Sequence, residues 1–149
     1  MIEVAWSVGI GRLPEDVFRH VADIERYPDW QRATGIVGVR RTDDGPLGPG
    51  SRFVIERLVR GNRGSVDCVV TAVDPGRRFA FRGRDSSGFD VETEIDLAPA
   101  GMGSRLDWRF RMTTPGLLSL AGGMLRREVL AAAESDFTSL KRMLEQVAS

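Results

Sequence analysis

The segment from Gly35 to Met112 is almost entirely strand-like, and it constrains the fold more than any other feature of the sequence. Much of it alternates hydrophobic with polar residues, which is typical of strands with one buried face. Clusters of Gly, Pro, Asp, Asn and Ser, the residues that tight turns require, divide it into short pieces. We predict six strands, at Ile36–Arg41, Arg52–Arg60, Ser65–Asp74, Arg77–Arg84, Phe89–Leu97 and Ser104–Met112.

A seventh strand and two short helices are predicted ahead of this segment. Residues Ile2–Ile10 alternate apolar side chains with small or polar ones. Pro14 suits the first turn of a helix, where its missing N–H costs no hydrogen bond. A second helical turn is predicted at Ile24–Tyr27, and Pro28 is expected to help end it.

The chain closes with a long amphipathic helix, predicted over Leu117–Val147. Gly122 and Gly123 interrupt its first part, and each costs about 1 kcal/mol in a helix interior relative to alanine. They predict a bend, a break or close packing at that point. Apolar residues recur at steps of three and four, which indicates one buried face: Leu130, Ala133, Phe137, Leu140, Leu144 and Val147.

These elements predict an α+β fold. A curled antiparallel sheet of seven strands must cover its apolar face, and only one long helix is available to do so. We therefore expect the sheet to wrap around the C-terminal helix, in a single domain of residues 1–149. Because one helix cannot fill the whole concavity, a cavity is expected near one end of it.

The charge and residue counts exclude several classes of function. The 21 basic and 21 acidic residues cancel, which argues against a partner held by bulk charge, such as nucleic acid. One cysteine and one histidine leave no disulfide and no metal site of Cys or His residues, and no cofactor motif is present. The longest apolar stretch is too short for a membrane span. We expect a cytoplasmic protein without membrane insertion, and the neutral charge leaves a homodimer open.

Short motifs add to this element order. They are Pro14–Phe18, Asp23–Trp30, Asp74-Pro75, Pro99–Leu106 and Leu140-Lys141. Over essentially the whole chain the sequence resembles the START/Bet v 1-like (SRPBCC) superfamily, and more narrowly its polyketide cyclase/dehydrase group. The resemblance implies a helix-grip fold with an apolar pocket between helix and sheet, used for lipids, polyketides or sterols. An arginine prominent in the cyclising members falls near Ala72 here, which departs from their pattern.

Two polar residues are the candidate catalytic groups, Tyr27 and Arg57. Tyr27 lies near the expected mouth of the pocket, where its hydroxyl is available for hydrogen bonding; it could equally cap the core. Arg57 alternates with Phe53 and Ile55, although the apolar Val54 and Leu58 at the alternate positions leave its orientation open. If it points inward, its charge must be paired or serve a ligand oxygen, and Asp136 is a candidate partner.

The remaining candidate residues are ligand-binding ones on the predicted inward faces. Cys68 is interpreted as a small buried hydrophobe rather than a nucleophile. Two functions follow as hypotheses: binding of a small hydrophobic ligand (lipid, polyketide or other greasy molecule), or a polyketide cyclase/dehydrase acting by general acid–base catalysis, with Arg57 stabilising an enolate oxygen. The candidate ligand-binding residues are Trp30, Phe53, Ile55, Cys68, Val70, Phe89, Val91, Thr93, Trp108, Phe110, Leu117, Met124, Ala133 and Phe137.

Two finer predictions concern the last hairpin and the start of the long helix. In the hairpin, pairing Asp96 with Arg105 would place acidic and basic residues opposite each other along the outer face. Residues 117–123 combine apolar side chains with two glycines, and we predict that they form a mobile lid or its hinge. The alternative is that the glycines permit close contact with Trp108.

Overall fold

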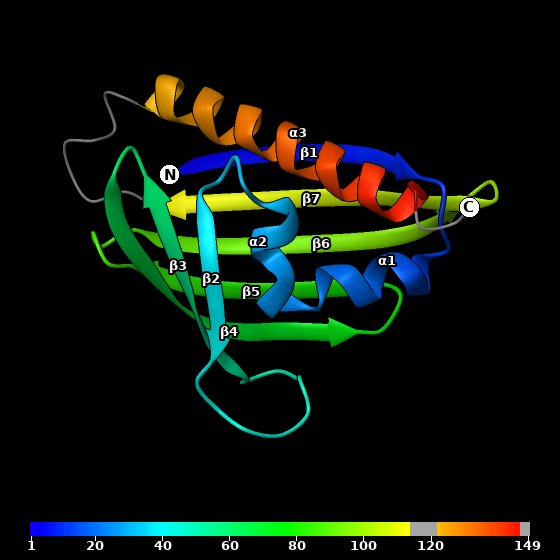
Figure 1. Cartoon of the computed structure of the whole chain (residues 1–149), viewed down its shortest axis with the longest axis horizontal. Helices are drawn as coiled ribbons and strands as arrows, with labels where there is room; N and C mark the ends of the chain where they lie inside the picture. The colour runs from blue at the N-terminus through cyan, green and yellow to red at the C-terminus, as the bar shows by residue number, and fades with distance from the viewer. Residues whose placement is uncertain (114–121, 147–149) are drawn as a thin grey trace.

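Seven antiparallel strands form one curved sheet, and the long helix α3 lies across its concave side (Figure 1). The computed structural model describes residues 1–113 and 122–146. The order of strands in the sheet is β1-β7-β6-β5-β4-β3-β2. The strands are β1 (Ile2–Ile10), β2 (Ile36–Arg41), β3 (Arg52–Val59), β4 (Asn62–Asp74), β5 (Arg78–Asp85), β6 (Asp90–Ala100) and β7 (Gly103–Thr113).

The helices occupy the positions that the sequence predicted. They are α1 (Pro14–Val21), the 3-10 turn η1 (Ile24–Arg26), α2 (Tyr27–Trp30) and α3 (Gly122–Gln146). The α+β helix-grip fold, with two short helices after the first strand and a long C-terminal helix, is confirmed. One detail differs: Pro28 lies in the first turn of α2 instead of ending the turn before it. A helix accepts proline there because the first N–H groups have no intrahelical partner.

The start of the predicted long helix falls partly outside the described residues. These begin again at Gly122, so Leu117 and most of the predicted lid cannot be placed. Gly123 lies in the first turn of α3, and a Cβ added there would meet no atom within 4 Å. The alternative interpretation, in which this glycine permits close contact with Trp108, is therefore wrong for Gly123.

The register of the β6–β7 hairpin differs from the predicted one by two residues. Asp96 lies opposite Asp107, not Arg105, because the turn is centred one residue later than expected. Ala100 pairs with Gly103, so that Gly101, at a φ of +57°, and Met102 alone form the turn. The facing carboxylates are neutralised on either side by two ion pairs: Arg78–Asp96 at 2.9 Å and Arg105–Asp107 at 3.0 Å.

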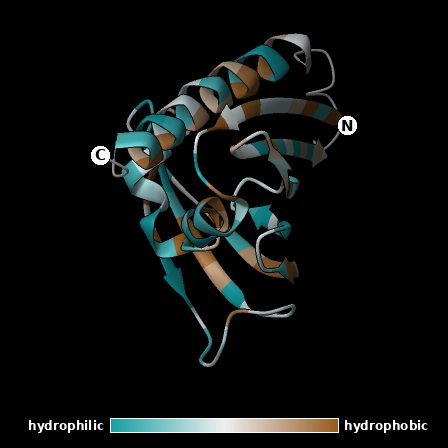
Figure 2. Ribbon diagram, turned by 90° about the vertical axis from the view of Figure 1, so that its right-hand side faces the viewer, coloured by the Kyte–Doolittle hydropathy of each residue, from teal (hydrophilic) through white to brown (hydrophobic). Residues whose placement is uncertain are grey.

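The core is packed most tightly where α1 and the last turns of α3 meet the sheet. Side chains from four elements are almost completely inaccessible there, and we call this region the closed end. Figure 2 shows bands of hydrophobic residues recurring along α3 and the strands, as the helical and strand periods require. The closed end consists of Val17, Val21, Phe79, Leu106, Leu140 and Leu144.

Polar contacts fasten α3 to the segment between β1 and α1 at this end. The backbone N–H of Gly11 donates to Glu145 Oε2 at 2.9 Å, and Lys141 Nζ donates to the Gly9 carbonyl. Arg12 donates to the Leu144 carbonyl, one of the last carbonyls of the helix, at 3.1 Å. Lys141 and Gly11 hold the pKa of Glu145 below its usual value through their hydrogen bonds. The C-terminal half of α3 is thus fixed by packing and by hydrogen bonds together.

None of the helices in the described ranges is long and apolar enough to cross a membrane.

Gly103 provides a test of how closely β7 approaches the end of β1. A Cβ on Gly103 would run into the Ile10 carbonyl, whereas a Cβ on Gly9 would meet nothing within 4 Å. We expect Gly103→Ala to lower the free energy of unfolding by about 1–3 kcal/mol, the usual cost of added bulk in a packed site. Gly9→Ala, the matched control, should change it by less than about 0.5 kcal/mol. Urea denaturation measures both, and equal effects would contradict the contact.

Candidate functional site

The burial of the apolar side chains on the concave face of the sheet differs between its two ends. Beyond the closed end, some of its inward-facing apolar residues remain partly exposed, and so do the apolar α3 residues in the first half of that helix. Arg126 of α3 donates to the Glu3 carbonyl at 3.0 Å, which places this half of α3 beside the start of β1 and the end of β7. We call this region the open end. It consists of Phe89 just before β6, Val91 and Phe110 on the sheet, and Leu125, Val129 and Leu130 on α3.

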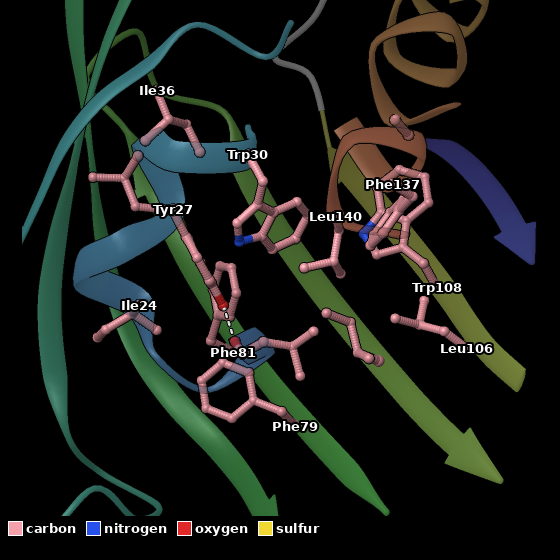
Figure 3. Packing of buried hydrophobic residues seen from close by; sticks show 14 of the residues in the cluster. Ile24, Tyr27, Trp30, Ile36, Phe79, Phe81, Leu106, Trp108, Phe137 and Leu140 are labelled. Atoms are coloured by element: carbon pink, nitrogen blue, oxygen red, sulfur yellow. Dashed lines mark hydrogen bonds between the residues drawn. The ribbon is translucent and has the colours of Figure 1, made fainter. Parts of the chain in front are cut away.

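A series of aromatic rings connects α2 with β7 across the interior (Figure 3). Trp30 packs against Tyr27, with ring centroids 5.5 Å apart, and against Phe137 at the same distance. Phe137 in turn lies 5.6 Å from Trp108, which stacks on Phe110 at 5.7 Å. We call these five residues the aromatic chain. It ends at Phe110, and so it leads from the buried interior to the open end.

Phe137 occupies the space between Trp30 and Trp108. Two hollows border other parts of residues 1–113 and 122–146, outside the space between α3 and the sheet. One, of about 310 Å³, is on the outer side of α3, and the other, of about 350 Å³, borders the β3–β4 hairpin. Between the two indoles, the concave side is thus occupied by the Phe137 ring.

The structure brings most of the predicted ligand-binding residues together on the concave side. Met124 is the exception, because its side chain is 66% exposed and does not belong to the core cluster. Leu117 lies outside the described residues. Phe89, Val91 and Phe110 are partly buried at the open end. The others are buried: Trp30, Phe53, Ile55, Cys68, Val70, Thr93, Trp108, Ala133 and Phe137.

Tyr27 is buried within α2, with only 1% of its side chain exposed. Its hydroxyl donates to the Val21 carbonyl at 2.6 Å, which ties α2 to the end of α1. Burial, more than the nearby Cys68 and Asp23, raises the pKa of this hydroxyl well above its usual value. The group therefore stays protonated, and it already has an acceptor within the protein.

Arg57 follows Phe53 and Ile55 on the inward face of β3, which settles its orientation. Its Nε and Nη2 donate to the Thr34 carbonyl at 3.2 and 3.1 Å. The predicted ion pair with Asp136 does not form in the described part of the chain. Both residues instead hold the loop between α2 and β2, so the charge of Arg57 is satisfied by a carbonyl.

Asp136 holds the same loop from the side of α3. Its carboxylate accepts hydrogen bonds from Ala33 N at 2.9 Å, from Thr34 N at 3.2 Å and from the Thr34 hydroxyl. The residue is only 4% exposed, and burial raises the pKa of its carboxyl while the three hydrogen bonds oppose that shift. Asp136 thus links the middle of α3 to the part of the sheet farthest from β1.

Cys68 is buried on the inward face of β4. Burial, followed in size by the charge of Asp67, raises the pKa of its thiol to about 12. The thiol is therefore uncharged at neutral pH and a poor nucleophile. No group of three or more His, Cys, Asp or Glu residues within the described ranges could hold a metal ion.

Sequence reasoning missed Leu125, Val129 and the loop at Thr34. Leu125 and Val129 lie eight and four residues before Ala133, so the helical period of the apolar face indicated both of them. Thr34 gave no such signal. Its contacts with Asp136 and Arg57 depend on how distant segments meet, and no local pattern encodes that.

Comparison with known proteins agrees with this architecture. Residues 1–145 match the protein family described as polyketide cyclase/dehydrase and lipid transport. No curated protein matches the sequence significantly.

Among solved structures, TTHA0849 from Thermus thermophilus is 19% identical with a TM-score of 0.79, and 99% of each chain is covered. A START superfamily protein from Mycobacterium smegmatis is 19% identical (TM-score 0.76; coverage 97% of this chain, 98% of that chain). The Zhui aromatase/cyclase from Streptomyces sp. R1128 is 16% identical (TM-score 0.77; coverage 99% and 95%). At these identities the likeness concerns the fold alone.

The raised pKa of Asp136 predicts how this residue changes stability with pH. Because the folded state binds its proton more tightly than the unfolded state, the Asp136 contribution to the free energy of unfolding should fall as the pH rises above the unfolded pKa of about 3.9. Wild type should therefore gain stability relative to Asp136→Asn as the pH is lowered from 7 towards 4.

Urea denaturation at several pH values measures this difference. Glu134→Gln, at an exposed carboxylate on the same helix, is the matched control and should show no such trend. The opposite slope would mean that the three hydrogen bonds outweigh the burial of the charge.

Proposed function

Because the chain belongs to the polyketide cyclase/dehydrase and lipid transport family, we propose that it binds a small hydrophobic ligand between α3 and the concave face of the sheet. The observation that carries the proposal is the open end. There, apolar side chains of β6, β7 and α3 face the same interior and remain partly exposed. Ligand sites are typically concave and mostly apolar with a few polar groups, and this region has that composition.

Burial of the open end supplies the driving force for binding. Each Å² of apolar surface removed from water contributes about 25 cal/mol, so a lipid or polycyclic aromatic covering Val91, Phe110 and Leu125 would gain several kcal/mol. The closed end offers nothing comparable, since its side chains are already inaccessible. The ligand should therefore enter at the open end and displace side chains of the interior, Phe137 first among them.

Catalysis of polyketide cyclisation or dehydration is the second candidate function. The family description and the similarity to an aromatase/cyclase favour it. In this role Arg57 would stabilise a developing enolate oxygen and Tyr27 would supply a hydroxyl. Both groups are already engaged, at the Thr34 and Val21 carbonyls, so a substrate would have to compete with these bonds. That competition favours binding as the primary function.

The enzymatic alternative makes a separate prediction. If the protein cyclises a poly-β-ketone, Arg57→Ala and Tyr27→Phe should each change the product distribution, as read by chromatography and mass spectrometry. An unchanged distribution in both variants would remove these two residues from any catalytic role. A cytoplasmic location and a homodimer also remain predictions, which cell fractionation and light scattering would test.

Val91 provides the sharpest test of ligand binding at the open end. We expect Val91→Trp to weaken the binding of fatty acids or polycyclic aromatics by about tenfold or more, because the added bulk fills space that the ligand needs. Glu92→Trp adds the same side chain one residue away on the exposed outer face and should leave the affinity unchanged. Fluorescence titration and native mass spectrometry measure both, and an equal loss in the two variants would place the ligand elsewhere.

A further inference from the structure

The indole N–H of Trp30 is a buried hydrogen-bond donor without an acceptor. The residue is only 2% exposed, and its Nε1 has no hydrogen-bond partner in the described part of the chain. Two arginine nitrogens share this property, but their guanidinium groups form other polar contacts. An indole has a single donor, so Trp30 has no other way to be satisfied. Leaving such a group unpaired costs about 1–3 kcal/mol, and nearly all buried polar groups avoid that cost.

The surroundings of Trp30 do not remove this cost. The nearby Tyr27 hydroxyl donates to Val21, and the Tyr27 ring packs at 76° to the indole. An aromatic face is a weak acceptor that does not replace an oxygen. Figure 3 shows the indole nitrogen on the side of the ring nearer Tyr27, and the six-membered ring on the side nearer Phe137. The donor therefore points into the core on the side of Tyr27.

We propose that Trp30 Nε1–H is the hydrogen-bond donor for a carbonyl or hydroxyl oxygen of the ligand. The protein would then select aromatic ligands that carry such an oxygen over hydrocarbons of the same shape. This inference rests on the proposed binding function and makes it specific.

The ring contacts of Phe137 indicate why the ligand should be aromatic. Its ring lies 5.5 Å from Trp30 and 5.6 Å from Trp108, between two indoles from different elements. A flat ligand ring that displaces Phe137 can form the same ring contacts, which are worth about 0.5–1.5 kcal/mol each beyond the area buried. The oxygen of that ligand would reach Trp30 Nε1 by extending past the edge of the indole towards Tyr27.

Fluorene and 9-fluorenone test the donor, because they share one tricyclic frame and differ only in a carbonyl group. Their dissociation constants are measured with wild type, Trp30→Phe and Trp6→Phe. We expect Trp30→Phe to weaken fluorenone binding about five- to tenfold more than fluorene binding, which is the range for one hydrogen bond. A loss of affinity that comes only from the smaller phenylalanine ring affects both compounds equally, so it cancels in the ratio of their dissociation constants. Trp6→Phe, the matched control on β1, should leave the ratio of the two constants as in wild type.

Wild-type protein alone gives a second measurement that does not depend on a variant folding. The indole N–H signals of Trp6, Trp30 and Trp108 are assigned from their contacts with neighbouring rings. Fluorenone should move the Trp30 signal downfield, as a new hydrogen bond to oxygen does, and fluorene should not.

The possible outcomes separate the two proposals. If both compounds bind, but Trp30→Phe leaves their affinity ratio unchanged and fluorenone leaves the Trp30 signal in place, the inference is wrong and the binding function stands. If neither compound, nor any member of the fatty-acid and aromatic panel, binds to wild type, both proposals are wrong.

Discussion

The structure depends on how one helix covers the concave face of a seven-stranded sheet. α3 is held unevenly along its length. Its last turns are packed against Leu106 and fastened through Glu145 to Gly11, and its middle inserts Phe137 between two indoles. Its first half packs only partly buried apolar side chains against the core, such as Leu125 and Val129, and adds exposed ion pairs such as Arg60–Glu128, which contribute little. The free energy that holds α3 in place therefore decreases towards the open end, where we propose that the ligand enters.

The two charged groups nearest the interior serve the architecture. Arg57 and Asp136 meet the same loop from opposite sides, through the Thr34 carbonyl and through the backbone N–H groups of Ala33 and Thr34. A buried charge is tolerated only when it is paired or hydrogen-bonded, and this loop satisfies both charges without an ion pair. The arrangement joins α3 to β3 across the concavity, so it limits how far the helix can move when a ligand enters.

The sequence predicted the elements well because period and turn chemistry are local. The stripe through Ala133 and Phe137 and the alternation in β6 and β7 gave the right buried faces. The hairpin register failed because Pro99 and Ala100 look like turn residues, and only their pairing partners show that they continue the strand. The contact of Asp136 with Thr34, 102 residues away, could not be predicted, since a polar residue on a helix does not reveal its partner.

The proposed binding relies on shape and on one directed hydrogen bond. Tyr27 is protonated and committed to Val21, Cys68 is an uncharged thiol, and Arg57 is committed to Thr34. These groups stabilise the surrounding structure, whereas the indole of Trp30 keeps a buried donor without a partner in the described residues. An unpaired donor destabilises the ligand-free state, and an oxygen that satisfies it recovers that cost only on binding. The same contact therefore gives affinity and discriminates between ligands, because a hydrocarbon of equal shape leaves the donor unpaired.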